Sequence, residues 1–323
     1  MVAGGAGFVG SAIVRELLHQ GSTVVCYDNY LHGHPAHVAG LSGPFTAIHG
    51  DVTDDWSLFK ALRDHQVEYI IDCVGDTFVP TAYAMPGRFF DINVGGTLHL
   101  LRAAQALSIK RMLYVSSTEV YGETERPKCH EEIPLNPVNT YAVSKAAADR
   151  LCYTYYVEHR VPVVIARIFN CYGPRETEPY VIPEIIAQLH RGPRIALGNI
   201  KAERDFTFVH DTANALISVL ASDLPDGEVV NVGSDTSFSV ELLALKLAEI
   251  MEANSLEIVI DPARLRRKDI DRFRCDNRKL LKYTHWKPTV RIDEGLKMTV
   301  EWFRANGSRW SWESFVDGAA IYR

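Results

Sequence analysis

The sequence predicts an α/β protein built on a parallel β-sheet with helices on both faces. Three observations support this prediction. Short runs rich in Val, Ile and aromatic residues alternate with helical patterns, the strands read as unbroken apolar runs such as VVIARI, and a glycine cluster precedes the first helix. Strand–helix alternation implies right-handed crossovers and parallel strands, and a parallel sheet buries both faces of its strands.

The elements of the first half alternate in the order that such a sheet requires. A first strand at 1–3 would be shorter than usual. The other strands are expected at Thr23–Tyr27, Phe45–His49, Tyr69–Cys73, Arg111–Val115 and Val163–Ile168. The helices between them are expected at Gly10–Gln20, Trp56–His65, Phe89–Leu107 and Tyr141–His159.

Beyond Gly173 the pattern changes to that of a smaller α+β lobe. Helices are expected at Val181–Leu189, Val209–Ser222, Ser239–Ala253 and Val290–Asn306, and strands at Arg194–Leu197, Asp205–Phe208 and Leu256–Ile260. We therefore divide the chain into a sheet domain at residues 1–172 and a second unit at 173–323 that is interleaved with the first. The aromatic end, SRWSWESFVDGAAIYR, is expected to pack on the rest of the chain.

The composition excludes several classes of function. The 323 residues carry a formal net charge of −6, which offers no general positive field to nucleic acid or an anionic membrane. No apolar run reaches the roughly 18 residues of a membrane helix, and no charged leader precedes the glycines. The six cysteines show neither CxxC nor zinc spacing. We therefore expect reduced thiols, no metal site and a cytoplasmic protein.

The glycine cluster GGAGFVG indicates a dinucleotide site. Gly4, Gly7 and Gly10 would allow a tight turn, close approach of a pyrophosphate and close helix packing. Phe8 and Val9 open the helix, whose free N–H groups suit phosphate. The motif alone is also compatible with an ordinary glycine-rich turn.

Two acidic strand ends strengthen the dinucleotide prediction. Asp28 ends the strand STVVCYD, where an acid binds ribose hydroxyls and repels a 2′-phosphate, so NAD is favoured over NADP. Asn29 follows it in the same expected site. Asp51, with Val52, ends the next strand. Asp51 either contacts the adenine edge or caps the helix near Trp56.

The stretch VSSTEVYG places three reactive side chains where a strand ends. Ser117, Thr118 and Glu119 follow an apolar run, and strand ends in open α/β sheets are where ligands bind. Glu119 is either a solvated loop residue or a proton carrier. A role as proton carrier is favoured, because a charged residue at this edge of a parallel sheet usually has a function.

A YxxxK pair supplies the remaining chemistry. Tyr141 and Lys145 lie one helical turn apart on one face. An ammonium beside a phenol lowers the phenol pKa, so that Tyr141 could take a hydroxyl proton while hydride leaves the same carbon. Ser117 would bridge phenol and substrate. The alternative is an amphipathic helix start with an exposed lysine.

Together these motifs resemble the extended short-chain dehydrogenase/reductase family of NAD-dependent nucleotide-sugar epimerases and dehydratases. The resemblance covers nearly the whole chain and includes the segments RIFNCYGPR, RDFTFVHD, FDINVGGT and NVGSDTSFSV. It implies a Rossmann-type doubly wound parallel sheet with a smaller C-terminal α+β substrate lobe, and NAD as cofactor. It places Asn93 of FDINVGGT at the cofactor, and it implies a homodimer formed through Phe89–Leu107 and Tyr141–His159.

The order Ser117, Thr118, Glu119 resembles the dehydratases of this family. The later segments YVIPEIIAQL, IALGNIKAERDFTFVHDT and DPARLRRKDIDRFRCDNRKL are most similar to 4,6-dehydratases acting on UDP-N-acetylglucosamine. The resemblance implies oxidation at C4, removal of the C5 proton by Glu119, loss of water from C6 and return of hydride to C6. Family members often use an aspartate as the acid, where this chain has Thr118. The acid is therefore either Glu119 itself or a water held by Thr118.

The resemblance also suggests the substrate contacts. Asn170, Val181, Arg204 and Arg266 match positions that hold the nucleotide sugar, and arginine binds phosphate through paired hydrogen bonds. Where relatives often read HLAA, this chain reads Asp72, Cys73, Val74 and Gly75, so cofactor contacts there are left open. A C4 epimerase, a UDP-glucuronate decarboxylase and a non-catalytic NAD-binding protein remain as alternatives.

Overall fold

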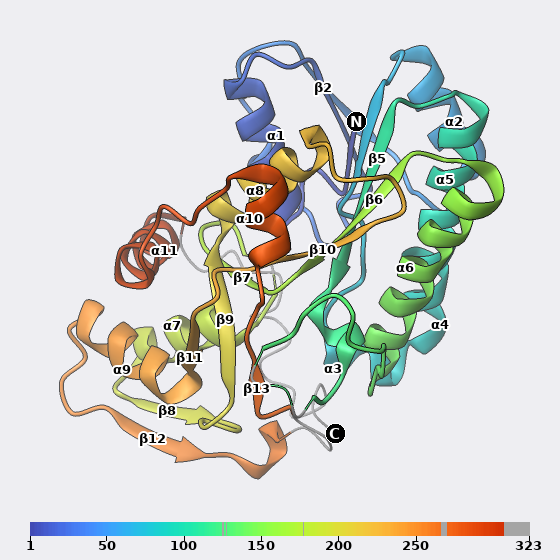
Figure 1. The fold of residues 1–323 in the computed structure, drawn as a ribbon. Helices are drawn as coiled ribbons and strands as arrows, with labels where there is room; N and C mark the ends of the chain where they lie inside the picture. Colours follow the sequence, from blue (N-terminus) through green and yellow to red (C-terminus); the bar gives the residue numbers. More distant parts are fainter. Residues whose placement is uncertain (125, 127, 177, 266–269, 307–323) are drawn as a thin grey trace.

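The computed structural model describes residues 1–124, 126, 128–176, 178–265 and 270–306 (Figure 1). Arg266 and the aromatic end at 308–323, for which the sequence analysis made predictions, lie outside the described residues. Two bodies are visible in Figure 1: a large sheet with helices on both sides, and a smaller lobe at the lower left built around α7 and α9.

The large body is a seven-stranded sheet in which every neighbouring pair is parallel, in the order β10-β6-β5-β4-β1-β2-β3. This confirms the predicted fold class. The first strand has only two residues, but it is central: Val2 pairs with Cys26 on one side and Ile71 on the other. The strands are β1 Val2–Ala3, β2 Val24–Asp28, β3 Phe45–His49, β4 Tyr69–Asp72, β5 Arg111–Ser117, β6 Val163–Ile168 and β10 Val229–Val232.

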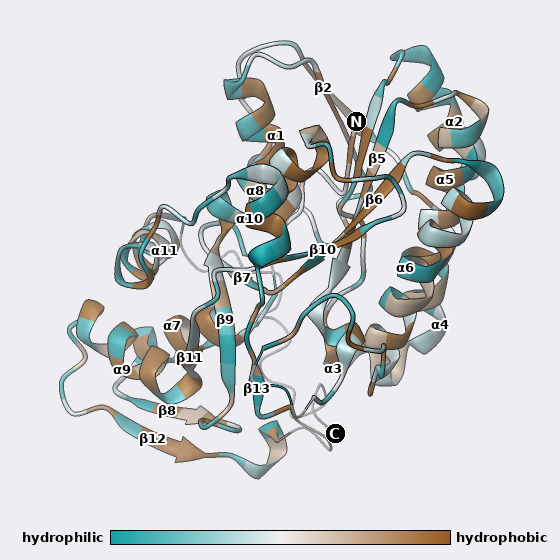
Figure 2. Cartoon of the chain, in the orientation of Figure 1, coloured by the Kyte–Doolittle hydropathy of each residue, from teal (hydrophilic) through white to brown (hydrophobic). Residues whose placement is uncertain are grey.

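Helices cover both faces of this sheet, because its strands are apolar on both sides. In Figure 2 the strand β6 is brown, hence hydrophobic. One face packs against α1 (Phe8–His19), α8 (Val209–Ala221) and α10 (Arg278–Thr284). The other packs against α2 (Asp55–Asp64), α5 (Thr97–Ala106) and α6 (Thr140–His159).

Two elements that follow residue 172 belong to this body. Helix α8 packs beside α1 in one apolar core, and β10 pairs in parallel with β6, with Val229 opposite Ile165. The sequence analysis assigned Val209–Ser222 to the second half and did not predict β10. The run VVNV is too short to be recognised as a strand without knowledge of its partner.

The predicted helix Phe89–Leu107 is interrupted by a π-helical turn. Helix α4 (Pro86–Phe90) leads into η2 (Asp91–Gly96) and then into α5. The turn carries Asn93, which is 1% exposed. Its side chain accepts from the N–H of Asp76 at 2.8 Å and donates to Ser144 Oγ at 2.9 Å. Such turns are rare in proteins, and those that occur are often found at functional sites.

The smaller lobe has its own apolar core between helices and short strands. Its sheets are β11-β9-β13, joined by β7, and the separate pair β12-β8. The elements are β7 Asn170–Tyr172, β8 Arg194–Leu197, β9 Glu203–Phe208, β11 Ser237–Ser239, β12 Glu257–Ile260, β13 Arg272–Phe273, α7 Val181–Arg191, α9 Val240–Ile250 and α11 Ile292–Asn306. Short helices occur at η1 Pro35–His37, α3 Val79–Ala84, η3 Thr118–Tyr121 and η4 Pro262–Arg264.

Three further features were checked within the described part of the chain. None of its helices is both long and apolar enough to cross a bilayer. Its histidines, cysteines and acids form no group of three or more arranged to hold a metal ion. All six cysteines are free thiols, and Cys26, Cys129, Cys152 and Cys275 are buried.

Candidate active site

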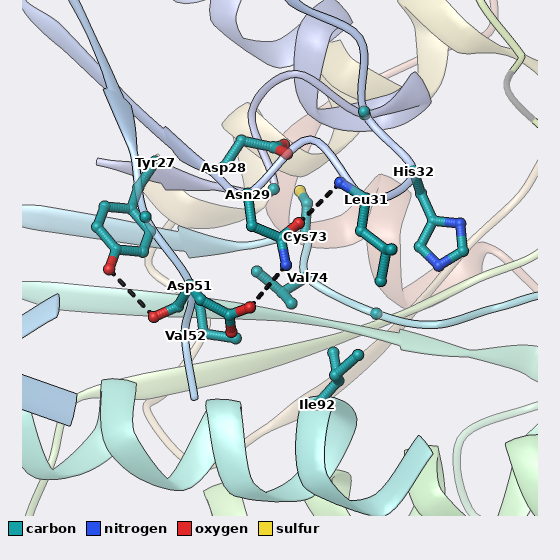
Figure 3. A pocket seen from close by; sticks show the side chains of 15 residues that line it. Tyr27, Asp28, Asn29, Leu31, His32, Asp51, Val52, Cys73, Val74 and Ile92 are labelled. Carbon is teal, nitrogen blue, oxygen red and sulfur yellow. Dashed lines mark hydrogen bonds between the residues drawn. The ribbon is translucent and has the colours of Figure 1, made fainter. Parts of the chain in front are cut away.

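A cleft runs along the carboxyl ends of the strands and consists of two hollows that share part of their walls. The first, of about 520 Å³, is lined by residues that follow β1, β2, β3 and β4 (Figure 3). The second, of about 1370 Å³, continues past the ends of β5 and β6 into the lobe. The residues common to both are Gly4, Gly7, His32, Cys73, Val74 and Gly75. This is the position at which open α/β sheets bind ligands.

The glycine turn has the shape that a dinucleotide requires. Gly4 has φ +72°, and a Cβ on Gly10 would lie 2.0 Å from the Gly4 carbonyl oxygen. Gly7 starts α1 without a side-chain cap, and the first turn contains no acid. The free N–H groups of this helix start therefore suit a pyrophosphate. Gly4, Gly7, Phe8, Val9 and Gly10 all line the second hollow, as the sequence analysis predicted for a cofactor site.

Asp28 supports the glycine turn as well as lining the first hollow. Its Oδ2 accepts from the N–H of Ala6 at 2.9 Å, and its Oδ1 accepts from the N–H of Tyr30 at 2.7 Å. Each carboxylate oxygen can accept more than one hydrogen bond. Asp28 can therefore hold the turn and still receive a ribose hydroxyl, the role predicted for it.

Asp51 lies beside Asn29 at the adenosine end (Figure 3). Asn29 Nδ2 donates to Asp51 Oδ2 at 2.8 Å. Burial raises the pKa of Asp51, but hydrogen bonds from Thr53 and Asn29 outweigh it and hold that pKa below its usual value. Helix α2 is capped by Asp54, which accepts from Ser57 N–H at 3.0 Å. The helix-capping alternative for Asp51 is therefore wrong. Val52 lines the same hollow.

The five predicted catalytic residues come together in the second hollow. Ser117 ends β5, Thr118 and Glu119 begin η3, and Tyr141 and Lys145 lie in the first turns of α6. The hydroxyl of Ser117 lies close enough to the phenol of Tyr141 to lower its pKa. Strand β5 runs two residues beyond its predicted end, which carries Ser117 to the phenol.

Lys145 is oriented differently from the prediction. Its Nζ donates to the carbonyl of Val115 at 2.7 Å and lies 4.4 Å from the centre of the Tyr114 ring. Burial raises the pKa of Tyr141 above its usual value, and the Ser117 hydroxyl only partly opposes this. The expectation that Lys145 lowers this pKa is therefore wrong for the protein alone, because the ammonium is directed toward the strand ends.

The residue that faces the Lys145 charge is Asp72, at the end of β4. Asp72 is fully buried, and its Oδ2 accepts from Thr97 Oγ1 at 2.9 Å. Burial raises the pKa of Asp72, and the charge of Lys145 opposes this rise. The sequence analysis recorded Asp72 only as a departure from the family pattern. Its signal was an acid at the end of the apolar run YIID.

Glu119 is held in the wall of the hollow by a side chain that the sequence analysis missed. Asn139 Nδ2 donates to Glu119 Oε2 at 2.9 Å, while Asn139 Oδ1 accepts from the N–H of Ala142 at 2.8 Å and so caps α6. Thr118 Oγ1 is buried and has no hydrogen-bond partner among the described residues. A half-buried, oriented carboxylate and a buried hydroxyl therefore face the same space.

The predicted substrate contacts are only partly in this hollow. Asn170 and Val181 line it, together with Phe206. Arg204 lines neither hollow; its guanidinium lies 5.5 Å from the centre of the Phe273 ring. Asn93, predicted at the cofactor, is instead buried behind Gly75 in the wall of the cleft.

Comparison with known proteins identifies the family. A sequence model of the family described as GDP-mannose 4,6 dehydratase matches residues 1–299. The chain belongs to this family. One relative is the dTDP-D-glucose 4,6-dehydratase of Mus musculus. It is 30% identical over 320 residues, which cover 96% of this chain and 90% of the mouse protein.

Solved structures of similar proteins include both a dehydratase and an epimerase. DesIV, a dTDP-glucose 4,6-dehydratase of Streptomyces venezuelae with NAD and TYD bound, has a TM-score of 0.89 and 30% identity, covering 96% of this chain and 98% of its own. A UDP-glucose 4-epimerase of Thermotoga maritima with UDP-glucose has a TM-score of 0.87 and 27% identity, covering 94% and 98%. These matches confirm the predicted nucleotide-sugar dehydratase and epimerase family and its Rossmann-type fold.

Proposed function

We propose that this protein is an NAD-dependent nucleotide-sugar 4,6-dehydratase. The observation that carries the proposal is the carboxylate of Glu119, which Asn139 orients in the same hollow as the hydroxyls of Ser117 and Tyr141. The proton transfer that accompanies oxidation or reduction at C4 needs only the hydroxyls of Ser117 and Tyr141, and the cofactor would take or give the hydride. Elimination across C5 and C6 also needs a base at C5. Glu119 is a carboxylate of this hollow whose charge acts on Tyr141.

The cleft residues suit NAD as the cofactor. The start of α1 would hold the pyrophosphate, and Asp28 and Asp51 would bind the adenosine end. When bound, NAD supplies the hydride acceptor for C4, the hydride donor for C6 and a positive ring charge that lowers the phenol pKa. Asp28 disfavours a 2′-phosphate by charge repulsion, which supports NAD over NADP.

The chain's own residues would then move protons. Tyr141 takes the proton of the C4 hydroxyl through Ser117. The resulting C4 carbonyl acidifies C5, and Glu119 removes the C5 proton. The C6 hydroxyl leaves as water with that proton, passed either directly or through a water bound to Thr118. C5 regains a proton at the end of the cycle. The proton that Tyr141 took from the C4 hydroxyl accounts for it in the overall proton balance.

The substrate is expected to be a UDP-hexose such as UDP-N-acetylglucosamine. Of the proteins named above, the two dehydratases are named for dTDP-glucose and the epimerase for UDP-glucose. The test therefore uses a panel of UDP-, dTDP- and GDP-hexoses with UDP-glucuronate. Loss of one water supports the dehydratase. Loss of carbon dioxide would instead indicate a decarboxylase, and an unchanged mass with an altered NMR spectrum would indicate an epimerase.

The decisive variant in this assay is Glu119→Gln, which keeps the shape of the side chain and removes the base. We expect it to lower the rate of dehydration by about a hundredfold or more, while hydride transfer from C4 of the sugar to NAD still occurs. Glu132→Gln, at an exposed position nearby in sequence, is the matched control and should retain full activity. Dehydration by Glu119→Gln at the wild-type rate would contradict the proposal.

We also infer that the protein forms a homodimer through the helices at one side of the sheet. Large apolar side chains are exposed there: Phe90 on α4 is 41% exposed, and Tyr153 and Val157 on α6 are 45% and 46% exposed. On α6, positions 153 and 157 are one helical turn apart and so share a face. Helices α4 and α6 pack against each other, and an exposed apolar face on such a pair of helices suits an interaction site.

A further inference from the structure

The two hollows of the cleft meet at His32, in the loop that follows β2. This side chain lines both hollows together with Gly4 and Gly7. Figure 3 shows the imidazole at the opposite end of the first hollow from Tyr27. His32 therefore lies beside the glycine turn, between the adenosine end of the cleft and the catalytic end.

His32 is paired with two acids from different parts of the chain. Its Nδ1 lies 2.6 Å from Glu178 Oε1, and its Nε2 lies 3.4 Å from Asp76 Oδ1. Burial lowers the pKa of His32, but the interactions of the imidazole with the carboxylates of Asp76 and Glu178 outweigh burial and raise the pKa to about 9. The imidazole is therefore a cation at neutral pH, and its contact with Glu178 is a charge-assisted hydrogen bond.

The acids that flank His32 are themselves anchored. Arg88 of α4 donates to Asp76 Oδ2 at 2.5 Å, and Asp76 is fully buried after β4. Glu178 lies in the segment after β7, which leads into α7 of the small lobe. The ion pair between His32 and Glu178 thus joins the loop after β2, on the sheet body, to the entry of the lobe on the other side of the cleft.

We propose that His32 and Glu178 form a cofactor clamp, an ion pair that closes the middle of the dinucleotide cleft and slows cofactor release, with Asp76 holding the imidazole from the other side. The clamp lies where the residues of the glycine turn would hold the pyrophosphate. A dinucleotide that extends from Asp51 to Tyr141 must pass this point, so its release requires the ion pair to open.

The value of such a clamp rests on the proposed function. A dehydratase returns to C6 the hydride that it took from C4, so loss of the reduced cofactor between these steps would leave the substrate stranded as an oxidised sugar. The clamp itself is measured by cofactor release alone. Failure of the dehydratase proposal would leave that measurement intact, and failure of the clamp would leave the dehydratase assay intact.

The experiment loads the full protein with NADH, mixes it rapidly with excess NAD and follows the loss of bound NADH fluorescence. We expect Glu178→Gln and His32→Gln each to release NADH about tenfold faster or more than the wild type, which is the loss of one charge-assisted hydrogen bond. His32→Lys, which keeps the positive charge, should recover part of the retention. The exposed controls His65→Gln and Glu301→Gln should release NADH at the wild-type rate.

A double variant separates the ion pair from a general loosening of the fold. If the two residues act through one contact, His32→Gln combined with Glu178→Gln releases NADH no faster than either single variant. Additive effects would overturn the ion pair as the cause, and release within about twofold of the wild type by both single variants would overturn the clamp. Should His32→Gln fail to fold, Glu178→Gln and His32→Lys decide the question.

Discussion

The side-chain amide of Asn139 forms two hydrogen bonds with different structural functions. Its oxygen caps α6, the helix that carries Tyr141, and its nitrogen holds the carboxylate of Glu119. The phenol and the base are therefore positioned by the same residue. Because Asn139 acts on Glu119 and does not itself face the reacting carbon in the proposed mechanism, it is a positioning residue.

This arrangement allows the two functions to be separated. Asn139→Asp keeps an acceptor at the N-cap but replaces the donor to Glu119 with a negative charge. We expect stability to change by less than about 0.5 kcal/mol, because aspartate caps as well as asparagine. Dehydration should fall by about tenfold or more, and its pH profile should move to higher pH, because a neighbouring charge raises the pKa of the base.

Asn139→Ala is the control, since it removes both hydrogen bonds and should cost about 0.5–2 kcal/mol of stability as well as activity. Thermal unfolding and initial rates across pH measure the two effects. If Asn139→Asp had the activity and pH profile of the wild type, Asn139 would be a helix cap only.

Residues that belong to a recognisable motif could be predicted from the sequence. Residues that position or face another functional residue could not. Ser117, Glu119 and Tyr141 stand at a strand end and a helix start, and the fold brings such positions together. Asn139 and Asp72 gave weaker signals, because their partners, Glu119 and Lys145, are identified only by the folded geometry. The direction of the Lys145 ammonium likewise depends on the Val115 carbonyl and the Tyr114 ring.

At the scale of elements, the sequence predicts those helices and strands that have a clear local pattern. The buried strands of the sheet were found because parallel strands read as continuous apolar runs. The π-helical turn before α5 was not predicted. Its Asn93 forms hydrogen bonds with Asp76 and Ser144, and such non-local partners cannot be identified from a local sequence pattern. The strand β10 was missed for a similar reason, since its partner β6 lies some sixty positions earlier.

The helix face of α4 and α6 gives a prediction at this scale. If the exposed side chains of Phe90, Tyr153 and Val157 form the dimer contact, a charge placed there should separate the protomers, because it would be buried without a partner. We expect the wild type to sediment as a dimer at micromolar concentration and the double variant Tyr153→Glu with Val157→Glu as a monomer.

Leu245→Glu is the matched control, since Leu245 is an exposed apolar residue of comparable exposure, 53%, on the distant helix α9. This variant should remain dimeric. A wild-type protein that sediments as a monomer, or a double variant that stays dimeric, would refute the assignment of this face.

At the scale of the whole molecule, the active site is assembled from both halves of the chain. The sheet body supplies the glycine turn, Glu119 and Tyr141, and the segments that enter the lobe supply Asn170 and Val181. The return of α8 and β10 to the sheet ties the two halves together. Sequence reasoning predicted the two units, but it could not predict which late elements return to the first one, because that pairing is long-range.

The central claim is that one hydride leaves C4 and returns to C6 of the same sugar within this cleft. The most direct measurement uses the nucleotide sugar that loses water in the panel, labelled with deuterium at C4. We expect the product to lose one water and to carry the deuterium in a CH₂D group at C6. Recovery of the deuterium at C4 of an epimer, or a product whose C6 carries none, would contradict the account.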